Sequence, residues 1–460
     1  MRGIPYLIFA VVFLIGYLVR EFGVPSVLTW LPEGISAILL VFLLLRFAAT
    51  KTLNLSIKYI VSFSVFLAII IVGILLNDVT EGPIIAGLRY YLKFFPFFLL
   101  PAIFEFSNKQ IQSQIAFLIF LGLLQLPLTF YQRFIQYYGH TTGDYISGTV
   151  GVTSTLSIVL ISYILIILAF YIRKRITAPI ALILTILLFI PCTLNETKGT
   201  VIFLIVGIIP IVVFGMGKRF EFKKVVVLFS AISLLLISFS AAYTTLYSQV
   251  DSAGGFFSFF SEGGAESYLY QDVEFDPEIL DRHRENKTIA ASNAEAWERM
   301  PRMDRLIAPF AILNTRPLNL AFGLGIGNVS DFKFKDYRGE YAYLNNLYNV
   351  ESLTLSQTLW ELGVLGAFAF FVFIYLIFED ARALSKEDGL IGSFAAGWLG
   401  VLAVFSVSLI YLNALQFSVI GFLFFYFSGY IAAENFKAKN LSRQNHNTAW
   451  KIANQKVLAN

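Results

Sequence analysis

Two basic residues, Arg89 and Lys93, lie four positions apart inside an otherwise apolar stretch of the chain. A helix over this stretch would place both side chains on one face. Basic side chains inside a membrane segment usually face a cavity and pair with something anionic. They could also extend to the membrane interface, or pair with an acid of another segment. No acid lies one helical turn from Arg89 in its own segment, which favours an external anion.

Two other stretches combine small, polar or basic residues with an expected helix start. Lys198 comes directly before an apolar segment, where unpaired N–H groups can hold phosphate and where the helix dipole disfavours a lysine unless an anion binds. The stretch 147–151 (SGTVG) opens another such segment, and its glycines permit close approach to the backbone. Arg133 and His140 precede it. The alternatives are a solvated turn at Lys198, a helix capped by a threonine at 147–151 and an interfacial anchor at Arg133.

Glu351 begins a further apolar segment and is followed by three hydroxyl residues within five positions. An acid at a helix start suits the helix dipole, so capping is one interpretation. A carboxylate at the mouth of a cavity could instead position or deprotonate a hydroxyl group. Glu361 lies deeper in the same segment and needs a partner, because an ionised group inside a membrane is costly.

The elements that must position these residues are membrane helices. The 460 residues are 57% hydrophobic and only 14% charged, whereas soluble domains are about 25% charged. The apolar residues fall in runs of roughly 17–25, the length that a helix needs to cross the hydrocarbon core. Continuous apolar runs such as 225–240 argue against a β-barrel. We therefore expect an all-α polytopic membrane protein.

Cytoplasmic loops carry the excess of Lys and Arg, which orients the chain. Placing the basic loops 46–58, 173–175 and 218–224 and the C-terminal tail inside predicts about twelve crossings with both termini cytoplasmic. The predicted spans are 4–19, 33–48, 58–76, 84–105, 110–131, 152–171, 177–193, 199–216, 225–246, 351–378, 391–411 and 414–433.

These spans divide the chain into four parts. We expect a membrane domain over 1–246, a large extracytoplasmic loop over 247–350, a second membrane part over 351–433 and a cytoplasmic tail over 434–460. The loop carries Arg302 and Arg305 in a stretch, 289–313, that should be helical. The spans 152–171, 199–216 and 351–378 would all begin on the side of this loop. Helix starts and arginine forks together suit a lipid-linked diphosphate at the outer leaflet.

Metal and nucleotide chemistry have little support. Cys192 is the only cysteine, which excludes an intrachain disulfide and a multi-thiolate metal site. The three histidines lie far apart in the sequence. The glycine-rich stretch 323–327 does not open a βαβ unit, so it does not indicate a nucleotide site. We expect no metal, no cofactor and no nucleic acid partner.

Several short motifs resemble those of the bacterial O-antigen polymerase and O-antigen ligase superfamily. They are FGLGIGN at 322–328, ELGVLG at 361–366, the stretch after the GTVG turn at 148–151, and TKG at 197–199. Twelve crossings with a large loop between the ninth and tenth helices match as well. The ligases have a histidine shortly before the ELGVLG-like motif, where this chain has Glu351, and Thr197-Lys198 replaces a frequent Ser-Arg. Both departures favour a polymerase of O-antigen, capsule or exopolysaccharide repeat units.

The resemblance implies a GT-C-like fold and a metal-independent glycosyltransferase in the bacterial plasma (inner) membrane, with the loop periplasmic or extracellular. It would polymerise, or ligate, oligosaccharide units linked to undecaprenyl diphosphate. Its other partners would be membrane lipids, a chain-length regulator and a flippase. The implied catalytic residues are Glu351, which aligns the acceptor hydroxyl, and Arg305. The implied substrate-binding residues are Arg89, Lys93, Arg133, His140, Lys198 and Arg302.

Two other classes of protein compete with this interpretation. A lipid-linked oligosaccharide flippase or another secondary transporter would also have twelve helices and intramembrane charges. Transporters often consist of two related halves with interrupted helices in matching positions. This sequence shows no such symmetry, and a hundred-residue external loop is unusual for them. A non-catalytic scaffold would need exposed apolar patches on the loop, and the arginines of the loop argue against that.

Overall fold

The computed structural model describes most of the chain, and every regular element in the described part is a helix. The described residues are 3–140, 142–215, 222–247, 275, 279–280, 300–332, 334–416 and 418–458.

Nine helical spans within these residues are long and apolar enough to cross a membrane. They are α1 (Ile4–Phe22), η1 with α2 (Ser26–Thr50), α3 (Ile57–Leu76), α6 to η2 (Asn108–Gln136), α8 (Thr153–Ile172), the part Val226–Leu246 of α11 (Phe222–Tyr247), α17 (Thr354–Leu384), α18 (Leu390–Tyr411) and the part Ser418–Leu441 of α19 (Ser418–Leu458). A bent pair, α4 (Glu81–Leu92) and α5 (Phe95–Ile103), would be a tenth, and α9 (Ala178–Leu194) and α10 (Gly199–Gly215) are shorter apolar helices. The chain is an all-α polytopic membrane protein.

Each predicted span coincides with one of these helices or pairs, but two differ in shape. The span 84–105 is not continuous, because α4 and α5 meet at 46°. Pro96 stands at the start of α5, where the missing N–H of proline is tolerated and a preceding helix would be interrupted. The span 351–378 begins later, since residues 350–352 form the 3₁₀ turn η6 (Val350–Ser352) ahead of α17. The total of twelve crossings remains a prediction, because it requires that α9, α10 and the bent pair also cross the membrane.

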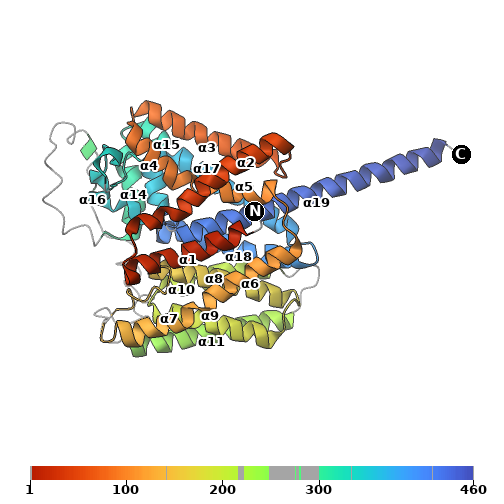
Figure 1. The fold of residues 1–460 in the computed structure, drawn as a ribbon, viewed down its shortest axis with the longest axis horizontal. Helices are drawn as coiled ribbons and strands as arrows, with labels where there is room; N and C mark the ends of the chain where they lie inside the picture. The colour runs from red at the N-terminus through yellow and green to blue at the C-terminus, as the bar shows by residue number, and fades with distance from the viewer. Residues whose placement is uncertain are drawn as a thin grey trace.

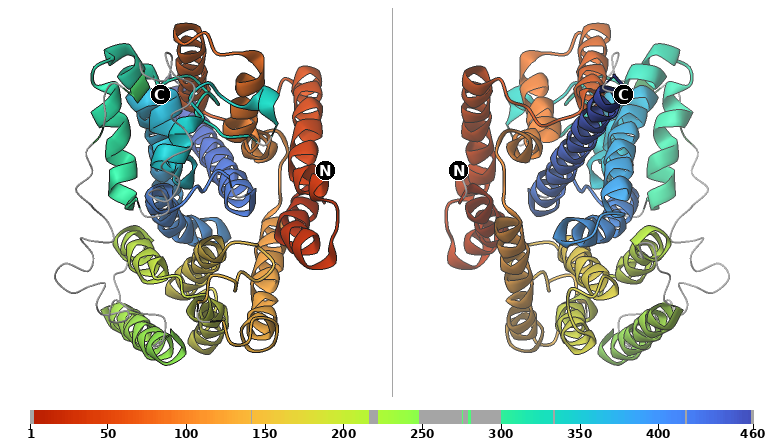
Figure 2. Two further views of the ribbon diagram at one scale, coloured as in Figure 1. Left: turned by 90° about the vertical axis from the view of Figure 1, so that its left-hand side faces the viewer. Right: turned by 90° about the vertical axis from the view of Figure 1, so that its right-hand side faces the viewer.

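The centre of the bundle is formed by α8, α18 and the first part of α19 (Ser418–Leu441), whose apolar segments are mostly buried. Figure 2 shows α18 and α19, in blue, between the red and orange N-terminal helices and the yellow-green helices α8 to α11. Aromatic rings fill this centre, as in the stack of Phe405 on Phe424 with ring centroids 3.5 Å apart. Dispersion contacts of this kind hold membrane helices together, because lipid gives no hydrophobic driving force between them.

The described part of the predicted loop forms three short helices at one end of the bundle (Figure 1). They are α14 (Arg302–Leu313), α15 (Pro317–Phe322) and α16 (Tyr343–Tyr348). Only residues 302–313 of the predicted helix 289–313 are described as helical, and its part 289–299 lies outside the described residues. The C-terminal helix α19 leaves the bundle at the opposite end (Figure 1). The side of the membrane on which each end lies remains a prediction.

Helix α17 is interrupted at Gly363 by the glycine-rich turn 323–327. The Leu324 N–H donates to the carbonyl of Trp360 (2.8 Å), and the Gly325 N–H donates to that of Glu361 (3.1 Å). Gly363 has φ 64°, a left-handed conformation that favours glycine, and a Cβ there would collide with the main chain of Ala321. The two motifs at 322–328 and 361–366 therefore pack directly on each other and position the first turns of α17.

We expect Gly363→Ala to destabilise the protein. A ψ of −168° places Gly363 in a region that essentially only glycine occupies, where another residue costs roughly 1–3 kcal/mol, and the collision with Ala321 adds to this. Thermal unfolding of the detergent-purified protein should show a lower midpoint. Gly34→Ala is the matched control, because a Cβ at this position in α2 meets nothing within 4 Å. Equal midpoints for the wild type and Gly363→Ala would contradict the role given to this break.

Candidate functional site

Two polar cavities lie beside each other at the end of the bundle that carries α14. The larger, of about 520 Å³, lies at the starts of α8, α10 and α17. The smaller, of about 390 Å³, lies between α2, α4 and the start of α19. Both are lined by Glu351, Asn413 and Gln416, which form the boundary between them.

Three helix starts face the larger cavity. The helices are 20, 17 and 31 residues long, and their first N–H groups carry a partial positive charge. The lining residues at these starts are Val152, Thr153 and Ser154 of α8, Thr197 and Lys198 ahead of α10, and Ser352 and Leu353 ahead of α17. The cavity therefore has a polar and electropositive wall without any contribution from ionised side chains.

Basic side chains add to this positive wall. Lys198, Arg302 and Arg305 all line the larger cavity, although the first is more than a hundred residues from the other two in the sequence. Arg305 Nη1 donates a hydrogen bond to Ser352 Oγ (2.9 Å). Arg302 Nε donates to the carbonyl of Tyr411 (3.2 Å), and its guanidinium lies 4.5 Å from the centroid of that ring. Both arginines are therefore held at the cavity by α17 and α18.

Three acids also line the larger cavity: Asp144, Glu196 and the shared Glu351. Glu196 accepts hydrogen bonds from the Gly143 N–H (2.6 Å) and from the Tyr243 hydroxyl (3.3 Å). Lys198 Nζ lies 5.7 Å from the centroid of the Tyr243 ring and makes no ion pair with any described acid. Its charge thus remains available to a ligand.

The smaller cavity contains Arg89 and Lys93, and here an acid from another helix changes the interpretation. Glu33 of α2 forms an ion pair with Arg89 (Nη2 to Oε1, 3.0 Å) and a longer one with Lys93 (3.5 Å). The guanidinium of Arg89 also lies 4.5 Å from the ring centroid of Trp30. Pairing with an acid, one of the alternatives that the sequence left open, is what the structure shows.

Glu351 stands at the boundary of the two cavities with both carboxylate oxygens held. Oε1 accepts from the Asp331 N–H (3.0 Å) and Oε2 from Asn345 Nδ2 (3.1 Å). Asn345 Oδ1 in turn accepts from the Glu351 N–H (2.9 Å). The carboxylate does not cap α17, whose N-cap residue is Leu353. Burial raises the pKa of Glu351 above its usual range, and the hydrogen bonds from Asp331 and Asn345 oppose this increase.

A buried network connects Glu351 to Glu361. Asn413 Nδ2 donates to the carbonyl of Glu351 (2.8 Å) and to Gln357 Oε1 (2.8 Å). Glu361, which is fully buried, accepts from Ser330 Oγ (2.7 Å) and from Gln357 Nε2 (3.3 Å). Sequence analysis missed Asn413, Gln357 and Ser330. Asn413 could have been found as a polar interruption between two apolar runs.

Arg133 and His140 line neither cavity. Arg133 donates to the carbonyls of His140 (3.1 Å) and of Leu246 (3.1 Å), so it ties this turn to the end of α11. His140 is exposed, and its ring packs 4.8 Å from that of Tyr145. The structure thus gives both residues a place in local packing, and it does not bring them to the other predicted site residues.

The turn at 147–151 offers only part of its backbone to a ligand. The Gly148 N–H donates to Gln132 Oε1 (2.9 Å), and the Thr149 N–H donates to Gln125 Oε1 (2.8 Å). These glutamines belong to η2 (Gln132–Gln136) and α7 (Gln125–Tyr131). Side chains from the preceding helices already satisfy these two N–H groups, so a ligand could approach the backbone only elsewhere in the turn, as at Gly151, where a Cβ would meet nothing within 4 Å. The turn also fixes the start of α8 at the larger cavity.

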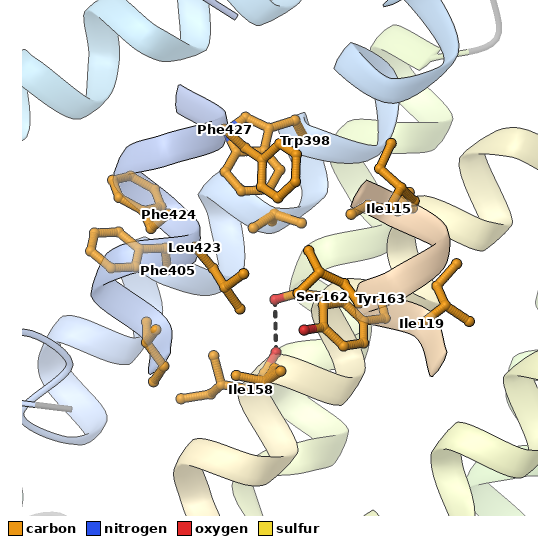
Figure 3. Close-up of a pocket in the computed structure, with 15 residues that line it drawn as sticks. Ile115, Ile119, Ile158, Ser162, Tyr163, Trp398, Phe405, Leu423, Phe424 and Phe427 are labelled. Atoms are coloured by element: carbon orange, nitrogen blue, oxygen red, sulfur yellow. Dashed lines mark hydrogen bonds between the residues drawn. The ribbon is translucent and has the colours of Figure 1, made fainter. Parts of the chain in front are cut away.

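A third cavity lies deeper in the bundle, between α6, α8, α18 and α19 (Figure 3). It has a volume of about 40 Å³, and its lining includes Leu423, Phe424 and Trp398 but no acidic or basic side chain. Ser162 and Tyr163 bring hydroxyl groups to this lining, and Ser162 Oγ donates to the carbonyl of Ile158 (2.7 Å; Figure 3). This cavity is a packing gap without groups for catalysis.

Comparisons with known proteins do not extend this description. No protein-family model matches the chain, and no curated protein matches it. Within the described part of the chain, no three His, Cys, Asp or Glu side chains gather in a way that could hold a metal ion.

Proposed function

We propose that this protein is a GT-C-like glycosyltransferase of the bacterial plasma membrane that acts on undecaprenyl-diphosphate-linked oligosaccharides. It would polymerise, or ligate, repeat units of O-antigen, capsule or exopolysaccharide at the outer face, with the loop 247–350 on that side and both termini cytoplasmic. One observation carries the proposal: two polar cavities, one of them electropositive, meet at the Glu351 carboxylate. Two adjoining cavities that share one carboxylate suit a transfer between two substrates.

The larger cavity suits the diphosphate of the donor. Phosphate oxygens accept hydrogen bonds from helix N-termini and from arginine forks, and Lys198 supplies a further positive charge. Lys198, Arg302 and Arg305 together offset most of the charge that a leaving diphosphate develops. Positive groups placed in advance lower the barrier, because they do not reorganise during the reaction.

Glu351 suits the role of general base towards the acceptor. In the proposed step the Glu351 carboxylate accepts the proton of an acceptor hydroxyl. At the same time the oxygen of that hydroxyl forms a bond to the anomeric carbon of the donor. The bond between that carbon and the phosphate oxygen breaks, and the diphosphate leaves with the electron pair. A raised pKa brings Glu351 closer to the operating pH, which makes it a better base than an exposed carboxylate.

Asn345→Ala should move the acid limb of the pH–rate profile to higher pH. The Asn345 amide donates to Glu351 Oε2 and so favours the ionised carboxylate. Without this hydrogen bond the pKa of Glu351 rises further, and a base is active only above its pKa. Initial rates of polymer formation across a pH series measure the shift. Asn54→Ala, in the connection between α2 and α3, should leave the profile unchanged; a similar shift in both variants would contradict the assignment.

An assay of the purified protein distinguishes a glycosyltransferase from a transporter. Reconstituted into liposomes with lipid-linked oligosaccharide and no ion gradient, it should convert single repeat units into a ladder of longer chains, visible by gel electrophoresis. Movement of the lipid-linked substrate across the bilayer without chain growth would reject the glycosyltransferase and favour the flippase.

A further inference from the structure

The smaller cavity differs from the larger one in the state of its charges. Its two basic residues, Arg89 and Lys93, share the Glu33 carboxylate. Asp331 is paired with Arg338 (2.8 Å), which lies outside the cavity lining. With Glu351 the lining contains three acids against two bases, and both bases are already paired with Glu33, whereas the larger cavity has three acids and three bases and its Lys198 makes no ion pair with a described acid. Transferring a dianion into it would bring uncompensated negative charges together.

The remaining lining residues are those that recognise uncharged polar molecules. Three are side-chain amides and three are aromatic. They are Gln357, Asn413 and Gln416, and Trp30, Tyr90 and Phe332. The amides of Gln357 and Asn413 are buried and already bonded within the network, whereas Gln416 is exposed and can donate to and accept from a ligand. A sugar presents hydroxyls at its edge and C–H groups on its faces, so amides and aromatic rings complement it.

Trp30 is the exposed aromatic residue of this group. It closes the short helix η1 (Ser26–Trp30), directly ahead of α2, and its side chain is 48% exposed. The Arg89 guanidinium, 4.5 Å from its ring centroid and paired with Glu33, holds the ring beside the cavity. The guanidinium covers one face of the indole, and nearly half of the side chain is exposed.

The geometry points to the smaller cavity as the acceptor subsite, which binds the uncharged terminal sugar of the acceptor glycan with Trp30 as its stacking platform. This inference rests on the proposed function. It revises the assignment of Arg89 and Lys93 to diphosphate: their pairing with Glu33 makes them orienting groups for Trp30 and the cavity wall. A sugar held there would present its hydroxyl to Glu351 from one side, while the donor approaches from the larger cavity.

The test measures the binding of two probes to the full-length protein in nanodiscs. One probe is undecaprenyl diphosphate without sugar, and the other is the free oligosaccharide that mild acid releases from the lipid-linked repeat unit. Trp30→Ala should weaken oligosaccharide binding about tenfold, or roughly 1.4 kcal/mol, and change undecaprenyl diphosphate binding less than twofold. Lys198→Ala should have the opposite pattern. Trp30→Phe keeps an aromatic face and should recover most of the oligosaccharide affinity, which separates stacking from misfolding.

The acceptor subsite is overturned if Trp30→Ala weakens both probes equally, if it leaves oligosaccharide binding unchanged, or if the wild type binds the lipid diphosphate but not the oligosaccharide. A different result would contradict the proposed function. If Lys198→Ala and Arg302→Ala both retain wild-type affinity for undecaprenyl diphosphate, the larger cavity is not the donor site, whatever Trp30 does.

Discussion

Glu351→Gln is expected to abolish chain growth while the protein remains folded in the membrane. Glutamine has nearly the shape of glutamate, and its oxygen can still accept the hydrogen bond of the Asp331 N–H. It cannot accept a proton from the acceptor hydroxyl. Loss of a general base typically costs about 10²–10⁴-fold in rate. The measurement is the rate of ladder formation by purified protein, with the membrane level of the protein followed by immunoblot in cells.

The control for this substitution is Glu379→Gln. Glu379 lies in the same helix, α17, about 25 residues from its start, and its side chain is half-exposed and 3.9 Å from Lys58. This variant should form normal ladders. A normal ladder from Glu351→Gln would remove the base from the mechanism, and the boundary between the cavities would then need another explanation.

Arg305→Ala should be the second most damaging substitution. It removes a guanidinium that lines the donor cavity and donates to Ser352 at the start of α17. Removing one preorganised donor to a developing charge costs about 10²–10³-fold. Arg305→Lys keeps the charge but not the forked geometry, so it should recover only part of the rate. Cells should lose long-chain polymer while retaining the protein in the membrane.

Arg46→Ala serves as the matched control for Arg305→Ala. Arg46 lies in α2, 13 residues beyond Glu33 and thus roughly 20 Å further along the helix. Its guanidinium packs 5.5 Å from the centroid of the Phe104 ring. Equal activity of Arg46→Ala and Arg305→Ala would show that Arg305 makes no specific contribution to the transfer.

The helices were largely predictable because lipid leaves the backbone few choices. An apolar run of sufficient length must satisfy its own N–H and C=O groups, so hydropathy alone located the nine long apolar helical spans of the described residues. Their interruptions are less predictable. Pro96 offers a local reason for the bend between α4 and α5. The break at Gly363 depends on the turn 323–327, some forty residues away, and local sequence does not show which segments will meet.

The candidate site likewise has features that the sequence could predict and features that it could not. The juxtaposition of Lys198 with Arg302 and Arg305 follows from topology, because helices that begin on one side bring their starts together. The pairing of Arg89 with Glu33 does not, since the acid belongs to another helix. The same holds for the turn 147–151, two of whose N–H groups are satisfied by Gln125 and Gln132. Local sequence shows which groups need partners, but tertiary packing decides where the partners come from.

A structure of the full-length protein with undecaprenyl diphosphate, determined by electron cryomicroscopy in nanodiscs, tests the central claim most directly. We expect density for the diphosphate in the larger cavity, within hydrogen-bonding distance of Lys198 and Arg302 and at the starts of α8 and α10. Diphosphate density at Arg89 and Lys93, or outside both cavities, would contradict the account.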